Sequence, residues 1–494
     1  MIGVPVRVEG GCEVAEGGTA GRPSSALREA LIPLALAQFI CSFAGTNMNV
    51  MINDMSRDLD TSVQGIQVAI TIFLLVMAAL MIPGGKLTDR WGRKRCFTVG
   101  LVLYGIGALL SAVSPGLGVL ILGNSIFEGV GTALLIPPVY ILTTLHFSDL
   151  TSRARAFGVI SALGGIGAAA GPLIGGVIAE GISWRAAFVF HAAVVAAIVI
   201  LSRRIEDPID ADPTRPFDAA GAVLSSVGMF CLVFGLLQAD NNVGLMAAFL
   251  AAGAALLTWF YIYIRGREQA GKEGLLPTRL FKNRTSNLGL ATQNIQWLLL
   301  MGTMFVVPVF LQEVRGYNPV QTGLVFTAAT LGVLVSSLAA ERLAKRRSQK
   351  TLIMAGFVTA AAGIGLLLAL LAVSVRVIAF APGLLLIGLG LGVMLTPSVN
   401  VVQSSFPAQD QDEISGLSRS VSNLGSSFGT AIAGTILVSD LASGNTTYAI
   451  AMAVLAAFAL IGLTAAARLP HGPEQRATTE PIAPHAPPPA VQRG

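Results

Sequence analysis

Fourteen apolar runs, each of about twenty residues, limit what this chain can fold into. They lie near 31–52, 65–84, 96–114, 117–143, 156–180, 186–202, 219–238, 244–264, 287–312, 321–340, 351–373, 376–400, 415–438 and 447–468. An apolar helix of that length crosses the hydrocarbon core of a bilayer. A soluble monomer could not hide so many apolar runs without exposing large patches. The pattern predicts an all-α polytopic membrane protein with about fourteen transmembrane helices.

The composition agrees with a membrane solvent and argues against a reactive centre. Hydrophobic residues make up 53% of the chain and charged residues only 12%, about half the usual charged share. The four cysteines form no CxxC pair, the four histidines form no HExxH motif, and no GxxxxGK[ST] phosphate loop is present. We therefore expect no metal site, no cofactor, no ATP drive and no enzymatic activity.

Alternate predicted loops are rich and poor in lysine and arginine, and this pattern indicates the orientation of the chain in the membrane. With both termini cytoplasmic, the inner loops carry twenty lysines and arginines, whereas the outer loops carry Arg57, Arg185, Arg315 and Arg376. Cytoplasmic loops are enriched in Lys and Arg in membrane proteins. This placement also explains the net charge of +5 without nucleic-acid binding. The bias predicts cytoplasmic termini in a bacterial inner (plasma) membrane.

A weak internal repeat predicts the domain organisation. The loop at 85–94 (GKLTDRWGRK) has a decayed counterpart at 341–350 (ERLAKRRSQK). A repeat of this kind divides the chain into two six-helix bundles, at 29–204 and 286–468, joined by a linker at 205–285 with two additional helices. Residues 1–28 lack the features of a signal peptide and are expected to form a cytoplasmic tail. Residues 469–494 are rich in Pro and Ala and are expected to be disordered.

Two motifs carry most of the functional signal. The first is the basic loop from Gly85 through Asp89, Arg90, Gly92 and Arg93 to Lys94. Its aspartate can hold a helix end or an arginine in one conformation and release it in another. The second is GAAAGPLIGG in the fifth run, with Gly167, Gly171, Pro172, Gly175 and Gly176. Such glycines present a smooth face to a partner helix, and the proline permits a bend. The simpler explanations are a loop that only anchors topology and ordinary small-residue packing.

These motifs resemble those of the major facilitator superfamily. The first is similar to its GxLxDRxGRK signature, and the second is similar to the GxxxGPxxGG motif associated with its exporters. Further stretches resemble the fourteen-helix drug–proton antiporter branch: Trp184–Arg185 with Phe188, Phe217–Asp218 with Gly221, 280–284 and 311–319. The resemblance covers about residues 31–468. It implies alternating access between two halves, with export of small amphipathic or apolar compounds driven by proton antiport.

The chain departs from this branch at positions expected to carry protons. The differing residues are Ala44, Ser125, Glu128, His191, Ala193 and Ser422, with Arg419 nearly one turn before the last of these. Glu128 is the clearest acid inside a predicted span, where an ionised carboxylate must be paired, neutral or in contact with water. It is our candidate proton site, with a structural acid as the alternative. We place His191 near the outer membrane interface.

Five amides form a candidate substrate site. They are Asn47, Asn49, Gln293, Asn294 and Gln296, on the first and ninth runs. Amides in hydrocarbon need hydrogen-bond partners, so these side chains either bind substrate or tie helices together.

The sequence thus predicts a monomeric secondary active exporter with a small-molecule substrate and protons as coupling ion. One alternative is a facilitator or importer of a specific metabolite, which would have the same fold but a different direction of transport or a different energy source. A membrane sensor or partner subunit without transport is the alternative of another class. Substrate identity does not follow from these residues.

Overall fold

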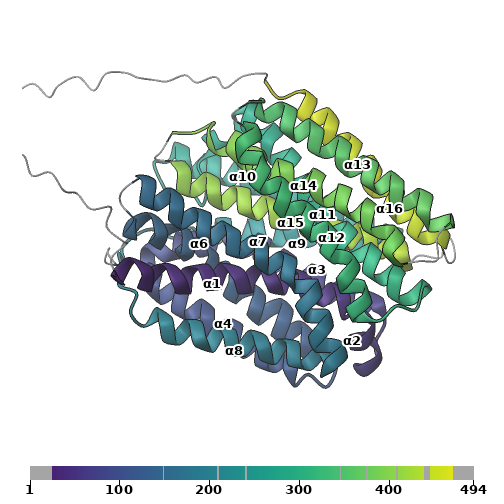
Figure 1. Ribbon diagram of the computed structural model, residues 1–494. Helices are drawn as coiled ribbons and strands as arrows, with labels where there is room; N and C mark the ends of the chain where they lie inside the picture. Colours follow the sequence, from purple (N-terminus) through teal and green to yellow (C-terminus); the bar gives the residue numbers. More distant parts are fainter. Residues whose placement is uncertain are drawn as a thin grey trace, which may run out of the picture.

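A computed structural model describes residues 25–147, 150–207, 211–239, 242–344, 346–373, 377–407, 410–438 and 445–470, and their regular structure is helical throughout (Figure 1). The elements are α1 (Ser25–Asn47), η1 (Met48–Val50), α2 (Ile52–Asp58), α3 (Val63–Trp91), α4 (Arg93–Ala112), α5 (Leu117–Leu120), η2 (Ile121–Glu128), α6 (Gly129–His146), α7 (Leu150–Gly181), α8 (Trp184–Ser202), α9 (Ala219–Leu237), α10 (Val243–Gln269), η3 (Thr278–Phe281), α11 (Arg284–Val309), η4 (Phe310–Val314), α12 (Pro319–Ala344), α13 (Gln349–Val373), η5 (Val377–Phe380), α14 (Ala381–Gln403), α15 (Gln411–Val438) and α16 (Asn445–Ala467). The expected tails lie outside the described residues, except that α1 already begins at Ser25 and residues 469–470 are described, with Leu469 buried.

The expected count of fourteen spans is reduced by the structure. Twelve of the described helices are long and apolar enough to cross a membrane, and α7, bent by 42° near Ala169, makes a thirteenth if it is taken as one span. The run at 415–438 does form a helix, α15, but α15 is not among them. Serine, threonine and asparagine recur along most of α15, so its polarity lowers the average below that of a typical span. Many of these hydroxyls donate to backbone carbonyls, which satisfies them inside the bundle.

The two halves of the bundle meet along two pairs of helices. α3 lies against α15 over its whole length: Gln67 binds the carbonyls of Thr430 and Ala431, and Lys86 at the other end pairs with Glu413 at 2.9 Å. α7 lies against α12, where a Cβ on Gly176 would come within 2.7 Å of the Pro319 carbonyl. Within the halves, α1 packs on α7 and α11 packs on α15.

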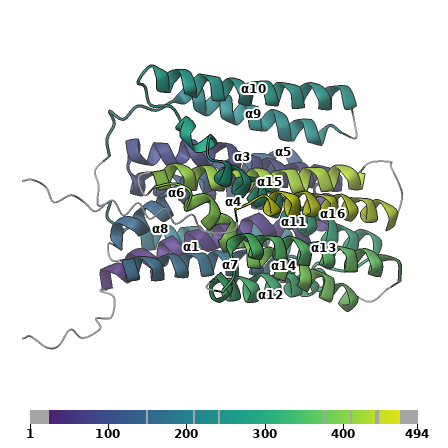
Figure 2. The same cartoon turned by 90° about the horizontal axis from the view of Figure 1, so that it is seen from above.

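The helices α9 and α10 form a pair at the edge of the bundle (Figure 2), where α9 contacts α3 and α15. Asp218 is the N-cap of α9, and its carboxylate accepts a hydrogen bond from the Gly221 backbone amide at 3.0 Å. It also accepts from the Tyr263 hydroxyl and the Leu275 amide, each at 3.0 Å. One buried side chain therefore fixes the start of α9 to the end of α10.

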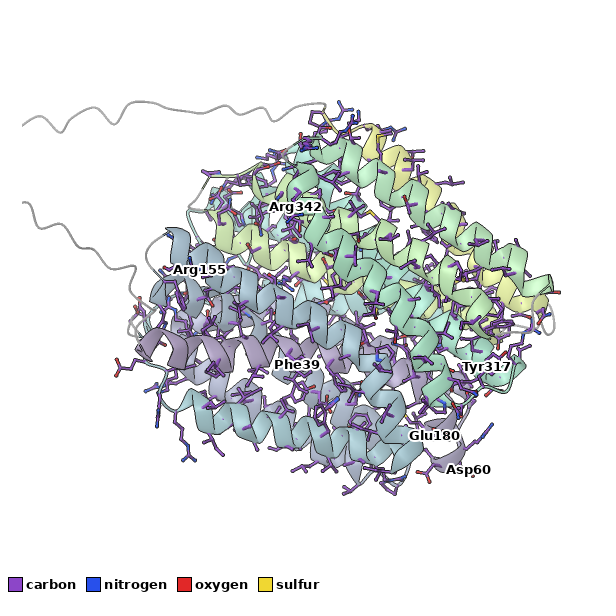
Figure 3. All side chains as sticks on the ribbon, in the orientation of Figure 1. Phe39, Asp60, Arg155, Glu180, Tyr317 and Arg342 are labelled. Atoms are coloured by element: carbon purple, nitrogen blue, oxygen red, sulfur yellow. The ribbon has the colours of Figure 1, made fainter. Side chains whose placement is uncertain are left out.

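Labelled residues mark the two opposite ends of the bundle (Figure 3). Arg155 on α7 and Arg342 on α12 are at one end, and Asp60, Glu180 and Tyr317 are at the other. At the second end, the Gln312 amide crosses between the halves to the Val50 carbonyl at 2.8 Å. We call the Arg155 end the inner end and the Glu180 end the outer end, following the charge alternation of the sequence.

Candidate functional site

Glu128 lies in the N-terminal half and is completely buried. It ends η2, a π-helical stretch between α5 and α6, a type of distortion that often marks functional positions. The helix α4 approaches η2 closely because a glycine lies at the contact: a Cβ on Gly107 would be 2.8 Å from the Glu128 backbone nitrogen. This tight approach brings α4, which carries Tyr104 one turn before Gly107, next to Glu128.

Three side chains from other helices close around Glu128. The His191 Nδ1 of α8 lies 3.3 Å from the Glu128 Oε2, and the Tyr104 hydroxyl of α4 lies 3.3 Å from the same Nδ1. The Asn47 Nδ2 of α1 lies 3.0 Å from the His191 Nε2. All four residues are 0% exposed. We call Glu128, His191, Tyr104 and Asn47 the buried polar cluster.

The hydrogen bonds assign a protonation state to the imidazole. An amide nitrogen only donates, so with the Asn47 Nδ2 facing the ring a neutral His191 accepts at Nε2 and carries its proton on Nδ1, directed at Glu128 and Tyr104. Two oxygens of the cluster, Glu128 Oε1 and Asn47 Oδ1, have no hydrogen-bond partner among the described residues. Oε1 has room to carry a proton, and Oδ1 would accept from a protonated Nε2 if the amide turned over. The cluster can therefore hold one more proton than it has.

The interfacial position expected for His191 is wrong. Its ring is fully buried two turns into α8, edge-on to Phe43 and Phe188 at centroid distances of 5.4 Å. Hydropathy places a residue along a span but does not tell which face of the helix meets α1 and α4. Tyr104 carried no sequence signal at all, because a tyrosine in an apolar run is unremarkable.

The glycines of α7 face two different helices. A Cβ on Gly167 or Gly171 would overlap Phe39 or Thr46 of α1, and one on Gly175 would lie 3.2 Å from the Asn47 Cβ. Gly176 instead faces α12, and Pro172 offers its carbonyl to Gly323 of α12, where a Cβ would be 2.6 Å away. The Thr46 hydroxyl also donates to the Ala168 carbonyl at 3.0 Å. The glycine motif therefore contacts α1, which carries Asn47 of the buried polar cluster, and also α12 of the C-terminal half.

The α3–α4 loop is held by a network of charges. The Asp89 carboxylate binds Arg93 at 2.8 Å and Arg215, in the segment before α9, also at 2.8 Å. The Lys94 amide donates to Asp207 at 3.1 Å. Gly92 has a φ of +94°, a backbone conformation that glycine adopts without strain, and it lets α4 start directly after α3. In this structure the loop is therefore fastened to the segment between α8 and α9.

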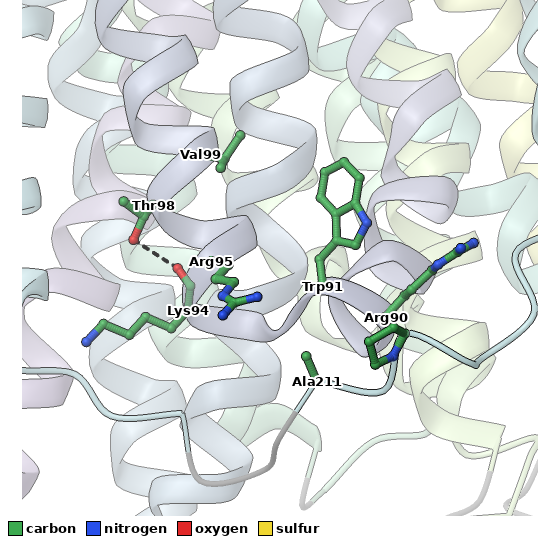
Figure 4. Close-up of a pocket in the computed structure, with 8 residues that line it drawn as sticks. Arg90, Trp91, Lys94, Arg95, Thr98, Val99 and Ala211 are labelled. Atoms are coloured by element: carbon green, nitrogen blue, oxygen red, sulfur yellow. Dashed lines mark hydrogen bonds between the residues drawn. The ribbon is translucent and has the colours of Figure 1, made fainter.

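A surface pocket of about 680 Å³ lies beside this loop (Figure 4). It is lined by Arg90, Trp91, Lys94, Arg95, Thr98 and Val99, with Ala211 across from them. The Thr98 hydroxyl donates to the Lys94 carbonyl at 2.9 Å. The pocket is at the basic inner end of the bundle, not between the halves.

The candidate substrate amides are engaged with neighbouring helices. Gln293 accepts from Ser418 of α15 at 2.9 Å, Asn294 donates to the Val421 carbonyl of α15, and Gln296 donates to the Leu391 carbonyl of α14. Asn49 donates to the Thr46 carbonyl of its own segment. The bonds of Gln293, Asn294 and Gln296, and that of Asn47 to His191, match the tying of helices that we weighed against substrate contact, whereas Asn49 bonds within its own segment. A substrate role for the five amides stays a prediction.

A contact between the halves was not foreseen from the sequence. Arg419 of α15 donates to the Tyr140 hydroxyl of α6, and its guanidinium lies 4.6 Å from the Tyr140 ring centroid. The Tyr140 hydroxyl in turn donates to the Gln38 Oε1 of α1 at 3.3 Å. The one available signal was that Arg419 is a charge inside an apolar run.

Comparison with known proteins places the fold. The model of the Major Facilitator Superfamily matches residues 34–430 and 289–492. The chain is 30% identical to the puromycin resistance protein pur8 of Streptomyces alboniger over 82% of this chain and 81% of that protein. It is 29% identical to the multidrug efflux pump LfrA of Mycolicibacterium smegmatis over 82% of this chain and 80% of that protein.

A solved structure has the same arrangement of helices. The peptide transporter POT superposes with a TM-score of 0.67 at 16% identity, covering 89% of this chain and 94% of that one. At that identity the likeness concerns the fold alone. Together with the family match over most of the sequence, it identifies the chain as a member of the major facilitator superfamily, and thus as a multi-pass membrane transporter.

Proposed function

We propose that this protein is a secondary active exporter of small amphipathic or apolar compounds, a multidrug efflux transporter that works by proton antiport with alternating access. The names of its relatives, a puromycin resistance protein and a multidrug efflux pump, support the export of toxic compounds. We further propose the fourteen-helix antiporter branch, with α15 as a polar span, and a monomer in a bacterial inner membrane with both termini cytoplasmic.

The proposed division of labour follows the contacts. Residues 29–204 and 286–468 form the two moving halves, and residues 205–285 carry the additional pair α9 and α10. The Asp89 loop, fastened to Arg93 and Arg215, serves as a switch that holds the present conformation. Contacts between the halves at Gly176 and Pro319, and at Gln312 and Val50, support a state closed at the outer end.

One observation carries the mechanism: Asn47 belongs to two contacts at once. Its side chain binds His191, which binds Glu128, and its backbone lies against Gly171 and Gly175 of α7. The neighbouring face of α7, about 100° around the helix, meets α12 at Gly176 and Pro172. A proton gained at Glu128 or His191 changes the hydrogen bond that the Asn47 side-chain amide makes with the ring. The resulting shift of Asn47 acts on α7, the helix that contacts α12 at the outer end.

The charge balance explains why the site can be sealed. An ionised carboxylate in hydrocarbon is expensive, and Glu128 is kept away from lipid by helices on every side. The His191 imidazole lies 3.3 Å from the carboxylate and supplies a hydrogen-bond partner that is itself fully buried. With one added proton the pair is neutral overall, and release of that proton leaves a single negative charge on Glu128, which the hydrogen bond from His191 stabilises.

The test is transport by the purified protein in liposomes with an imposed pH gradient. We would follow three dyes, neutral Nile red, anionic fluorescein and cationic rhodamine 123, in the wild type and in Glu128→Gln. At least one dye should accumulate against its gradient in the wild type. In the variant this accumulation should fall by at least about tenfold, since the amide cannot exchange a proton at the intramembrane site.

The control variant is Glu206→Gln, which removes an exposed carboxylate near the inner end and should transport normally. Dye that merely equilibrates, whatever the pH gradient, would favour a facilitator. Movement of none of the dyes in the wild type would favour a sensor or partner subunit. Gradient-driven accumulation that survives Glu128→Gln would remove Glu128 as the proton site.

A further inference from the structure

The second charge inside the membrane, Arg419, has a different setting from Glu128. It lies two turns from the inner end of α15 and is only partly buried. A guanidinium at this depth faces either water or a partner, because exposure to lipid is costly. None of the described carboxylates forms an ion pair with it, and its contact is the hydroxyl and ring face of Tyr140.

The surroundings of Arg419 are aromatic and come from the opposite, N-terminal half. Tyr140 of α6 stacks on Phe157 of α7, with ring centroids 5.8 Å apart and an interplanar angle of 18°. Its hydroxyl, having accepted from Arg419, donates to Gln38 of α1. Arg419, Tyr140 and Phe157 are all partly exposed, so each keeps surface for a ligand. Three helices, α15, α6 and α7, therefore bring a cation and two flat rings together where the halves meet.

This set of groups recognises a particular chemistry. A planar guanidinium binds carboxylates with two parallel hydrogen bonds and stacks on aromatic faces. Tyrosine and phenylalanine rings offer stacking surface to a flat ligand. A cationic ligand would meet an unneutralised like charge, and the mid-span acid among the described residues, Glu128, is sealed inside the N-terminal half. Charge and shape thus favour an aromatic anion over an aromatic cation.

We propose that Arg419 and Tyr140, with Phe157 beside them, form a substrate subsite that selects flat aromatic compounds carrying a carboxylate or comparable acidic group. The proposal rests on the proposed export function and adds a substrate class to it. Arg419 is the specificity-determining residue, and Tyr140 holds its guanidinium while offering a stacking face.

The experiment measures equilibrium binding to the purified protein in detergent, by fluorescence polarisation at constant pH. Fluorescein and rhodamine 123 share a xanthene ring system and differ in charge, so their affinity ratio isolates the contribution of charge. The wild type should bind fluorescein more tightly. Arg419→Gln should weaken fluorescein binding by about tenfold, the equivalent of one lost charge-assisted hydrogen bond, and should not weaken rhodamine 123 binding.

Two further variants keep the result interpretable. Arg419→Lys keeps the charge without the planar fork and should retain part of the preference for fluorescein. Arg265→Gln removes one exposed positive charge from the inner end of α10 and should bind both dyes as the wild type does. If Arg419→Gln fails to fold, as judged by its elution profile, the partial loss in Arg419→Lys decides the question.

The outcomes separate this proposal from the proposed function. Tighter binding of rhodamine 123 by the wild type, or an affinity ratio that Arg419→Gln and Arg419→Lys leave unchanged, overturns the anion subsite while dye export can still stand. Arg419-dependent binding of fluorescein supports the subsite even if no dye follows a pH gradient in liposomes, since binding in detergent requires no gradient.

Discussion

The two halves each place one charge inside the membrane, and the two charges are treated in opposite ways. Glu128 in the N-terminal half is 0% exposed and is enclosed by His191, Tyr104 and Asn47. Arg419 in the C-terminal half is partly exposed and reaches across to Tyr140 of the other half. A sealed pair suits a proton, which needs only a change of protonation state. A partly open cation suits a ligand that must enter and leave.

The difference also separates what each charge contributes to stability. Removing the hydrogen-bond partner of a buried carboxylate leaves a charge that water cannot reach, whereas a partly exposed charge remains solvated. If the comparison is correct, matched deletions on the two sides will differ in size and in pH dependence.

The largest effect is expected for His191→Leu. It leaves the Glu128 carboxylate buried without its partner and should lower the free energy of unfolding by about 3–5 kcal/mol. The variant can relieve the charge only by taking up a proton, so stability should be lost as the pH rises. Denaturant titration in detergent micelles at mildly acidic and mildly alkaline pH measures both the size and the sign.

Arg419→Leu is the matched deletion in the other half. Because Arg419 is partly exposed and contacts a ring face, its loss should change stability by only about 1 kcal/mol, with little pH dependence. Equal losses in the two variants would mean that the sealed and open environments do not differ energetically.

A second, smaller effect concerns the link from the buried polar cluster to α7. Gly171→Ala places a methyl group against the Thr46 hydroxyl and 3.1 Å from the Asn47 backbone nitrogen. Overpacking of this kind costs about 1–3 kcal/mol and should also slow transport, because α1 and α7 can no longer approach. Stability and initial transport rates in liposomes are the measurements.

The control for that substitution lies on the same helix. Gly165→Ala adds the same methyl group where no atom lies within 4 Å, so it should fold and transport as well as the wild type. A slow Gly165→Ala variant would show that helix flexibility, not the contact with Asn47, limits transport.

A comparable effect is expected at the α3–α4 loop. Asp89→Asn weakens the hold on Arg93 and Arg215 by removing the negative charge between them. Because Arg93 is largely buried, we expect a loss of about 1–2 kcal/mol in the preference for the present conformation. Labelling of a cysteine introduced at the outer end by Glu180→Cys, measured with and without the Asp89 substitution, reports that shift. An unchanged labelling pattern would separate Asp89 from the conformational equilibrium.

The sequence predicts the depth of a residue along a membrane span better than it predicts the face of the helix on which the residue lies. Depth along a span follows from hydropathy and charge, so the helices and the position of Glu128 inside the membrane were predictable. Which face of a helix meets which neighbour did not follow, because α8 is apolar on every side and gives no preferred direction. His191 was therefore misplaced, and the contact of Arg419 with Tyr140, which are 279 positions apart, had no local signature. The polarity of α15 shows the same limit. Two of its serines donate hydrogen bonds to carbonyls of α3, and a hydropathy average along one helix carries no information about such neighbours.

The smallest effect is expected where the halves meet in contact with solvent. Lys86 and Glu413 lie 2.9 Å apart with side chains 33% and 21% exposed. A pair this accessible contributes about 0.2–1 kcal/mol, so Lys86→Gln or Glu413→Gln should each change the free energy of unfolding slightly. A double-mutant cycle with both substitutions gives the coupling energy, and added salt should reduce it because screening acts on exposed charges. A coupling of several kcal/mol that resists salt would place this pair with Glu128 among the sealed charges, and the contrast between the halves would then no longer follow exposure.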